Sequence, residues 1–333
     1  MTSATATPPV AGETPPTIRE RTGKAFAGSG GAFVGLVILV IALSVTAPNF
    51  LSTRNFTNII DQVTVLGILA LGATFVIIVG GIDLSVGSIL ALSGITMGWL
   101  YQNAGVPLPL AMVIAVLVGG VAGLINGLGV TIFRLPAFIA TLAMMSIARG
   151  LANLITDGQQ IVGYPQWFYE LSTNRYFGFL SITVALLLLL FVAGWAFLRY
   201  RRAGRSLYAI GGGQEVARLA GINVRRTTTS VYVVAGLLAG VGAIVLSSRL
   251  DASAPSAATG YELDVIAAVV IGGASLMGGA GRVTGTIIGV LIIGVLRNGL
   301  NLLGVSPFIQ QIVIGLVIAV AVGSDVLRRK SNR

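Results

Sequence analysis

The chain has 333 residues, of which 55% are hydrophobic and only 10% are charged. Soluble domains carry about 25% charged residues, so the composition indicates an all-α polytopic membrane protein. There is no cysteine and no histidine, which excludes disulfides, thiolate nucleophiles, histidine bases and Cys/His metal sites. The net charge is +10, but the basic residues lie between apolar runs, which indicates topology signals and not a nucleic-acid surface.

Residues 1–28 are rich in Thr, Pro, Ala and Ser, which is typical of a disordered cytosolic tail, and they lack the plan of a signal peptide. We predict a transmembrane domain over 29–327 and a basic cytosolic tail over 328–333. A span needs about 20 apolar residues. The candidate spans are 29–47, 60–81, 84–101, 108–132, 137–155, 177–198, 229–248, 263–279, 283–303 and 307–326.

The candidates at 263–279 and 283–303 nearly merge around a Gly-rich turn. One of them could be re-entrant, so we expect eight to ten transmembrane helices. With ten spans and a cytosolic N-terminus, 16 Lys and Arg residues face the cytosol and only Arg54 and Arg175 face outward. Because Lys/Arg-rich short loops stay on the cytoplasmic side, we predict that both termini are cytosolic.

The predicted external loop at 156–176 carries four aromatic residues: Tyr164, Trp167, Phe168 and Tyr169. These fit a segment that lies at the membrane interface. A docking surface for an external protein is the alternative interpretation.

Residues 80–88 read GGIDLSVGS. Asp83 is predicted to cap the following helix by accepting a backbone N–H bond from Ser85 or Val86; the alternative is a hinge or gate at a break in the bundle. A second break at 272–279, GGASLMGG, shares the pattern Gly-Gly-x-x-Leu-x-x-Gly with 80–87. Glycine-interrupted spans in matching positions of two halves point to a translocation path.

Several polar residues interrupt the apolar runs or border them. They are Asn126, Arg149, Asn153, Arg297, Asn298, Asn301 and Gln310. Ionisable groups at membrane depth cost roughly 3 kcal/mol on insertion scales, so they face the bundle interior or a water-filled path. Two interpretations stay open: these groups bind sugar hydroxyls along a path, or they tie helices together.

The most charged internal stretch is the loop at 199–226, with seven arginines and one acid, Glu215. Val216, Leu219 and Ala220 recur at helical spacing, so we predict a short surface helix over 214–220. Gly221 follows where a helix ends, and Glu215 and Arg218 are spaced to pair. Gly211–Gly213 are predicted to form a flexible lead-in. The apolar stripe needs a partner, either lipid headgroups or another protein.

The phosphate-loop pattern G-x-x-x-x-G-K-[ST] is absent, and no intramembrane pair of carboxylates suggests hydrolysis. The energy for any transport therefore comes from a gradient or from another subunit. A gradient-driven secondary transporter would use an intramembrane acid, for which Asp61 and Asp264 are the candidates. An intramembrane enzyme is a further alternative, which the lack of Cys, His and paired acids disfavours.

Three stretches resemble one known family: GGIDLSVGS at 80–88, GRSLYAIGGGQEVARLAGINV at 204–224, and the run at 269–318. The chain resembles, over about 33–326, the membrane permease subunit of bacterial ABC importers of the ribose/xylose/galactoside type. The resemblance implies import of a monosaccharide across the bacterial plasma (inner) membrane, without covalent chemistry in this chain.

The resemblance also implies partners: an ABC ATPase subunit that binds ATP and Mg, an extracytoplasmic solute-binding protein, a second permease copy or a close relative in its place, and membrane lipid. No cofactor is expected in this chain. The family's coupling segment has a Glu-Ala-Ala-like core followed by glycine. Its counterpart here comprises Glu215, Val216, Ala217, Arg218, Leu219 and Gly221, with Val216 departing from the pattern. Arg297 is a second departure, because a neutral polar residue is expected before Asn298.

Overall fold

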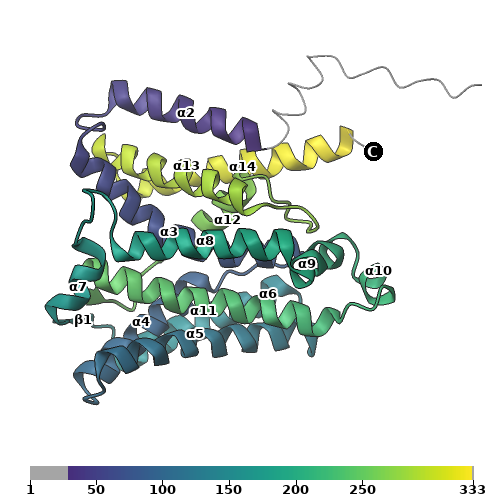
Figure 1. Cartoon of the computed structure of the whole chain (residues 1–333), viewed down its shortest axis with the longest axis horizontal. Helices are drawn as coiled ribbons and strands as arrows, with labels where there is room; N and C mark the ends of the chain where they lie inside the picture. The colour runs from purple at the N-terminus through teal and green to yellow at the C-terminus, as the bar shows by residue number, and fades with distance from the viewer. Residues whose placement is uncertain (1–28, 332–333) are drawn as a thin grey trace, which may run out of the picture.

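The computed structural model describes residues 29–331, so the predicted tail at 1–28 and residues 332–333 lie outside the described part. The described chain is a bundle of helices (Figure 1). The helices are α2 (Ser29–Thr46), α3 (Thr53–Ile78), α4 (Val86–Gln102), α5 (Leu108–Thr131), α6 (Ala137–Thr156), α7 (Gln166–Thr173), α8 (Ile182–Tyr200), α9 (Arg202–Gly212), α10 (Gln214–Leu219), α11 (Val224–Leu250), α12 (Tyr261–Ile271), α13 (Val283–Leu302) and α14 (Pro307–Ser331).

Three helices begin at side chains that accept a backbone N–H left free by the first turn. Ser52 accepts from Asn55 at the start of α3, Ser181 from Val184 at α8, and Asn223 from Arg226 at α11. Such caps satisfy donors that have no partner inside the helix. Pro107 and Pro136 directly precede α5 and α6, where their fixed φ suits the helix start and their missing N–H costs nothing.

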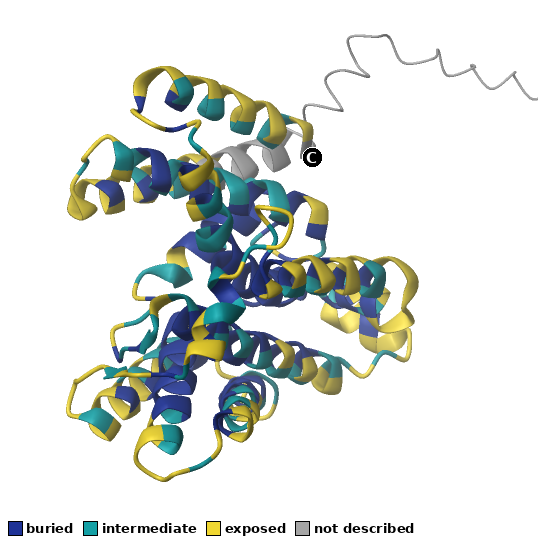
Figure 2. Cartoon of the chain, turned by 60° about the vertical axis from the view of Figure 1, so that its left-hand side comes forward, coloured by how far each residue is buried: buried dark blue, intermediate teal, exposed yellow. Residues whose placement is uncertain are grey.

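The centre of the bundle is formed by α3 and α11, and Figure 2 shows buried positions gathered where the helices cross. In α3 the most apolar stretch is 83% buried, whereas in α6 and α8 it is only 28% and 33% buried. The outer helices therefore present apolar faces that, in a membrane, contact lipid.

Glycine lets α5 and α11 approach closely. A Cβ atom at Gly119 would collide with the carbonyl oxygen of Gly236, and one at Gly123 with that of Tyr232. Small residues four apart give such contacts between membrane helices. The abundance of glycine in the sequence thus has a packing role at this helix pair.

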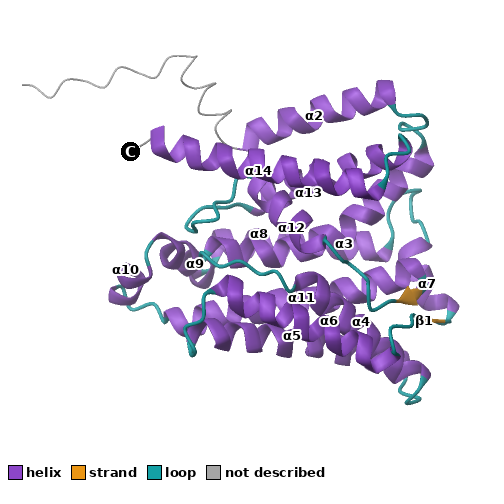
Figure 3. Ribbon diagram, turned by 180° about the vertical axis from the view of Figure 1, so that it is seen from behind, coloured by secondary structure: helices purple, strands orange, loops and turns teal. Residues whose placement is uncertain are grey.

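Figure 3 shows the two ends of the bundle. The α10 end carries α9 and α10, and the α7 end carries α7 with the antiparallel strands β1 (Ile161–Val162) and β2 (Ala252–Ser253). Helix α2 begins, and helix α14 finishes, at the α10 end (Figure 1). Both ends of the described chain thus lie on the same side as the arginine-rich loop.

Six of the described helices are long and apolar enough to cross a membrane: α3, α5, α6, α8, α11 and α13. The apolar parts searched in α2 and α14, Gly30–Thr46 and Pro307–Val320, fall below that length, as does the 17-residue α4. The helical fold class is confirmed, with six candidate spans where eight to ten were expected.

The predicted span at 263–279 is wrong in its second half, because α12 ends at Ile271. Gly272 and Gly273 follow, and Gly273 adopts a φ of +91°, which a helix cannot contain. Eleven residues rise about 16 Å, about half the hydrocarbon thickness. Helix α12 alone therefore does not cross the membrane.

The sequence patterns did not predict α7, α9 or the strand pair. Helix α7 buries Phe168 completely, and Tyr164 just before it is also buried, while Trp167 and Tyr169 remain exposed. Only the last two are therefore free to form the interfacial surface expected for 156–176.

Candidate functional site

The arginine-rich loop forms two short helices after α8, of which α9 packs on the bundle and α10 projects from it. All seven of its arginines are exposed: Arg199, Arg201, Arg202, Arg205, Arg218, Arg225 and Arg226. The predicted surface helix is confirmed as α10. Its apolar stripe faces outward, with Val216 72% and Leu219 79% exposed. An exposed apolar stripe within a cationic surface is typical of a docking site.

Three details of α10 agree with the sequence pattern. Glu215 and Arg218 pair across one turn at 2.5 Å, with both side chains largely exposed. Gly221 has a φ of +79°, the left-handed conformation that ends a helix. Ala217 is buried and seats the helix against its own loop, so the stripe of Val216 and Leu219 points away from the bundle.

The flexible lead-in predicted at Gly211–Gly213 is wrong for its first two residues. Gly211 and Gly212 are the last residues of α9, and only Gly213 separates α9 from α10. Leu207 and Ile210 of α9 are buried at 1% exposure, so α9 is anchored in the bundle by its apolar face. This amphipathic helix explains why the chain stays helical through a glycine pair.

Asp83, Ser85 and Asn126 form one buried polar group at the break between α3 and α4. The predicted hydrogen bond from the Ser85 backbone N–H to Asp83 Oδ1 is confirmed at 2.9 Å, and the Ser85 hydroxyl donates to the same oxygen at 2.6 Å. The prediction that Asp83 caps α4 is wrong, because α4 begins at Val86 and Ser85 occupies the N-cap position. Asn126 of α5 donates from Nδ2 to Ser85 Oγ at 2.8 Å. The three residues are each at most 3% exposed, so this group joins the break to α5.

Arg149 and Arg297 hold elements near the α7 end. Arg149 Nη1 donates to the carbonyl oxygens of Pro255 and Ala257 in the loop before α12. Arg297 of α13 forms an ion pair with Asp264 of α12 at 2.7 Å, and the Asp264 side chain is only 2% exposed. A buried carboxylate needs a counter-charge, which accounts for an arginine where the family resemblance implies a neutral residue.

The remaining amides also join neighbouring elements. Asn298 Nδ2 donates to Asn55 Oδ1 at 2.7 Å, and Gln310 Nε2 donates to Asn301 Oδ1 at 2.7 Å. Within residues 29–331, the polar residues predicted as path or gate are thus held in separate contacts, apart from the Asp83–Ser85–Asn126 group. The structure does not gather them into one site.

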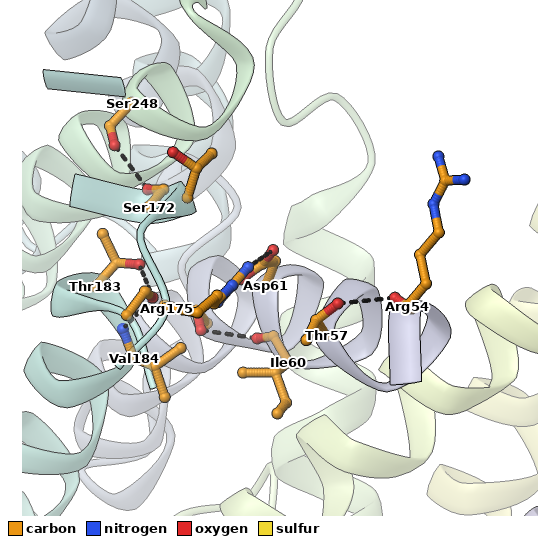
Figure 4. A network of polar contacts seen from close by, with 12 residues as sticks. Arg54, Thr57, Ile60, Asp61, Ser172, Arg175, Thr183, Val184 and Ser248 are labelled. Carbon is orange, nitrogen blue, oxygen red and sulfur yellow. Dashed lines mark hydrogen bonds and ion pairs between the residues drawn. The ribbon is translucent and has the colours of Figure 1, made fainter. Parts of the chain in front are cut away.

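Figure 4 shows a further set of polar contacts at the α7 end. Arg175, before α8, pairs with Asp61 of α3, and Ser172 of α7 bonds Ser248 of α11 at 2.6 Å. Tyr164 bonds Ser253 of β2 at 2.7 Å, and burial raises the pKa of Tyr164 to about 12. Its phenol therefore remains neutral at physiological pH.

Comparison with known proteins decides the family. The profile described as branched-chain amino acid transport system / permease component matches residues 55–322, which is most of the chain. The chain belongs to this permease family. It is the membrane component of an ABC transport system and not an enzyme, and it resides in the plasma (inner) membrane as a multi-pass protein.

Three relatives of this permease match nearly their full length. The ribose import permease protein RbsC of Bacillus subtilis is 47% identical over 90% of this chain and 93% of its own. RbsC of Escherichia coli K12 is 42% identical over 88% of this chain and 92% of its own. The L-arabinose ABC transporter permease protein AraH of Azospirillum brasilense is 36% identical over 91% of this chain and 89% of its own.

Sequence reasoning missed several partners of the permease's predicted residues. The Asn298–Asn55 hydrogen bond and the Arg297–Asp264 ion pair each join residues that are far apart in sequence. No local spacing pattern in the sequence indicates either contact. Tyr208 of α9 donates its hydroxyl to the carbonyl oxygen of Gly281 at 2.9 Å. The amphipathic spacing of Leu207 and Ile210 is the one sequence signal that could have revealed α9.

Proposed function

We propose that this permease imports a monosaccharide, of the pentose or hexose class, that an extracytoplasmic binding protein delivers. The near full-length similarity to permeases named for ribose and L-arabinose supports this substrate class. The chain contributes the membrane path and no covalent chemistry. ATP and Mg bind to a separate ATPase subunit, whose hydrolysis drives alternating access.

The exposed stripe of α10 carries this proposal. Val216 and Leu219 project from a surface of seven exposed arginines, whereas the Ala217 side chain is buried. We place the coupling contact here: Glu215, Val216, Arg218 and Leu219 dock into a groove of the ATPase. Ala217, which was also predicted to couple, holds the helix against the chain from its buried side, and Gly221 sets the end of the helix. Val216 adds apolar surface at the position where the family pattern has a small residue, which enlarges that contact.

The α10 end is accordingly the cytosolic end. Exposed arginines gather there, as loops on the cytoplasmic side require, and the described termini lie on the same side (Figure 1). The finer topology that we propose has eight to ten spans with both termini cytosolic, in which α12 enters from the α7 end and the non-helical break after it completes the crossing to the α10 end. The 11-residue length of α12 and the contact of the break with α9 support such an interrupted span.

The α7 end is then external and receives the binding protein.

We propose Asp83, Ser85 and Asn126 as a gate at the α3–α4 break, because they join the break to α5 inside the bundle. The helices of the external half of the bundle are held around the path by the contacts of Arg149, Arg297, Asn298, Asn301 and Gln310. A second copy of the chain, in a homodimer, completes the path.

Co-purification tests the coupling contact. We expect the tagged chain, extracted in mild detergent, to carry ATPase activity, and Leu219→Asp to reduce the retained activity at least about tenfold, since interface hot spots are worth about 2 kcal/mol or more. Phe177→Asp is the matched control: Phe177 is 89% exposed but lies near the α7 end, so it should retain the ATPase.

Two outcomes would contradict the proposal. If Leu219→Asp retains the ATPase like wild type, α10 is not the docking helix. If the chain purifies alone and moves solute in vesicles without ATP, a gradient-driven transporter becomes the better account. In that case Asp61 and Asp264 would have to leave their arginine partners during transport.

A further inference from the structure

Three glycine-rich segments that are far apart in sequence meet at one point near the α10 end. They are the start of the break after α3 (residues 78–81), the break after α12 (residues 277–281), and the last turn of α9 (residues 208–212). We call this contact the glycine junction. The two breaks share a sequence pattern, and the structure joins them directly, because the Gly279 N–H donates to the Ile78 carbonyl oxygen at 2.9 Å.

The backbones at the junction touch with no side chain between them. A Cβ atom at Gly278 would lie 2.9 Å from Gly80 Cα and 3.0 Å from Gly211 Cα. Real Cβ atoms essentially never make the first contact and rarely make the second, so Gly278 is enclosed by the other two segments. Gly80 and Gly278 both have positive φ, +82° and +86°, which favours glycine for a second reason.

Gly211 occupies the central place in the junction. A Cβ atom there would collide with the Ile78 carbonyl oxygen and with the Gly279 nitrogen, the two atoms of the hydrogen bond between the breaks. The missing side chain therefore leaves room for that bond. The adjacent Gly212 has nothing within 4 Å of its Cβ position, so the constraint applies to one residue of the pair.

Tyr208, one turn earlier on α9, makes a second link to the same break. Its hydroxyl donates to the Gly281 carbonyl oxygen at 2.9 Å. Burial raises the pKa of Tyr208, so the hydroxyl keeps the proton that it donates. Helix α9 is thus fixed to the junction by one hydrogen bond and by one backbone-to-backbone contact.

We infer that Gly211 and Tyr208 are the positioning residues through which a movement of α10 reaches both helix breaks at once. Close-packed backbone contacts transmit displacement because they have no side chain that can change rotamer to absorb it. Only Gly213 lies between α9 and α10, so a force on α10 acts on α9 directly. Because the two breaks are hydrogen-bonded to each other, α3–α4 and α12–α13 shift together.

This inference rests on the proposed docking of α10 to the ATPase, but it concerns a different step. Docking decides whether the ATPase binds. The junction decides whether ATP hydrolysis moves the spans. The two steps therefore fail differently, and the retained ATPase and the sugar transported per ATP hydrolysed separate them.

Gly211→Ala is the decisive variant and Gly212→Ala its matched control, in the complete transporter reconstituted with its ATPase and binding protein. The probe is ribose in proteoliposomes. We expect Gly211→Ala to retain the ATPase and its hydrolysis, while ribose transported per ATP falls at least about tenfold, within the range of coupling between sites. Gly212→Ala should transport like wild type. Equal transport by the two variants would overturn the inference.

Tyr208→Phe covers the case in which Gly211→Ala does not fold. It removes one hydrogen bond and keeps the ring, so the protein should assemble normally while ribose transported per ATP falls about threefold. An unchanged ratio, with normal assembly, would contradict the role of Tyr208. Loss of ATPase binding in either variant would instead show that α9 belongs to the docking step, and would also overturn the inference.

A cross-link tests whether the junction moves as one unit. The chain has no cysteine, so Gly212→Cys and Met277→Cys introduce a single pair; Met277 is 77% exposed and lies two residues from Gly279, which contacts Gly212. A short bis-maleimide that joins α9 to the break should leave ribose transport intact. Transport that stops on cross-linking would show that α9 slides along the break and would overturn the inference.

Discussion

Three arginines near the α7 end are held differently from the seven arginines of the 199–226 loop. At the α7 end, Arg149, Arg175 and Arg297 each contact a carbonyl or carboxylate of another element. At the α10 end, all seven arginines of the 199–226 loop are exposed, and the apolar side chains of Val216 and Leu219 are exposed beside them. The first arrangement pairs each of these arginines with another part of the chain, and the second leaves an exposed surface that a partner protein can contact.

This difference between the two sets of arginines predicts that substitutions at the two ends affect different properties: stability at the α7 end and coupling to the ATPase at the α10 end. A charge that is buried and paired destabilises the protein when its partner is removed, whereas an exposed pair contributes little to stability. Substitutions at the α7 end should therefore lower stability first. Substitutions at α10 should leave stability unchanged and affect the ATPase interaction.

The largest effect is expected at the Asp264–Arg297 pair. Arg297→Ala leaves the Asp264 carboxylate buried without its counter-charge, which should lower the free energy of unfolding by about 3 kcal/mol. Thermal unfolding in detergent measures the loss. Arg54→Ala, at an exposed arginine of the same end, should unfold like wild type.

The double variant Arg297→Met with Asp264→Leu sharpens the result. Replacing both charges by apolar side chains removes the unpaired carboxylate, so most of the lost stability should return. If Arg297→Ala is as stable as wild type, the pair does not hold α12 against α13, and the contrast between the two ends fails.

A smaller effect on stability is expected at Ser85, because only Asp83 of the three buried residues Asp83, Ser85 and Asn126 can carry a charge. Ser85→Ala removes the acceptor of Asn126 and one donor to Asp83, which should cost about 1–3 kcal/mol. Ser88→Ala is the control, because the Ser88 hydroxyl donates only to the Ser85 carbonyl within the same segment. If the two variants lose the same free energy of unfolding, the hydrogen bond from Asn126 of α5 to Ser85 does not stabilise the protein more than the local bond of Ser88 does.

Local patterns in the sequence predicted what depends on local spacing. Nine of the ten apolar runs each correspond to a helix, and the run at 263–279 does so only in its first half. Helix α10, with its Glu215–Arg218 pair and its terminating Gly221, follows from spacing within seven residues. The Asp83 bond to Ser85 is likewise a contact over two residues. The membrane class followed from composition, and the family followed from the stretches at 80–88, 204–224 and 269–318.

Contacts between distant segments were not predictable in this way. The span over 263–279 was predicted from hydrophobicity, which does not change at Gly272 and Gly273. The helix α12 nevertheless ends before them, because Gly273 adopts a backbone conformation that is not helical. The predicted polar path residues lie in separate contacts because their partners, such as Asn55 and Asp264, come from other helices. The match between the two glycine breaks was visible in the sequence, but their contact with α9 was not.

The smallest effect on stability, and the sharpest contrast between the ends, is expected from Glu215→Gln. The variant keeps the side-chain size but breaks an exposed pair, so the free energy of unfolding should change by no more than about 0.5 kcal/mol. Since Glu215 lies in the proposed docking helix, the ATPase activity that co-purifies should nevertheless fall. Glu170→Gln is matched to it: Glu170 lies on the short helix α7, bonded to Gln166 one turn earlier, at the opposite end. Both variants should unfold like wild type, and only Glu215→Gln should lose ATPase. A loss of ATPase in both, or in neither, would remove the functional distinction between the two ends.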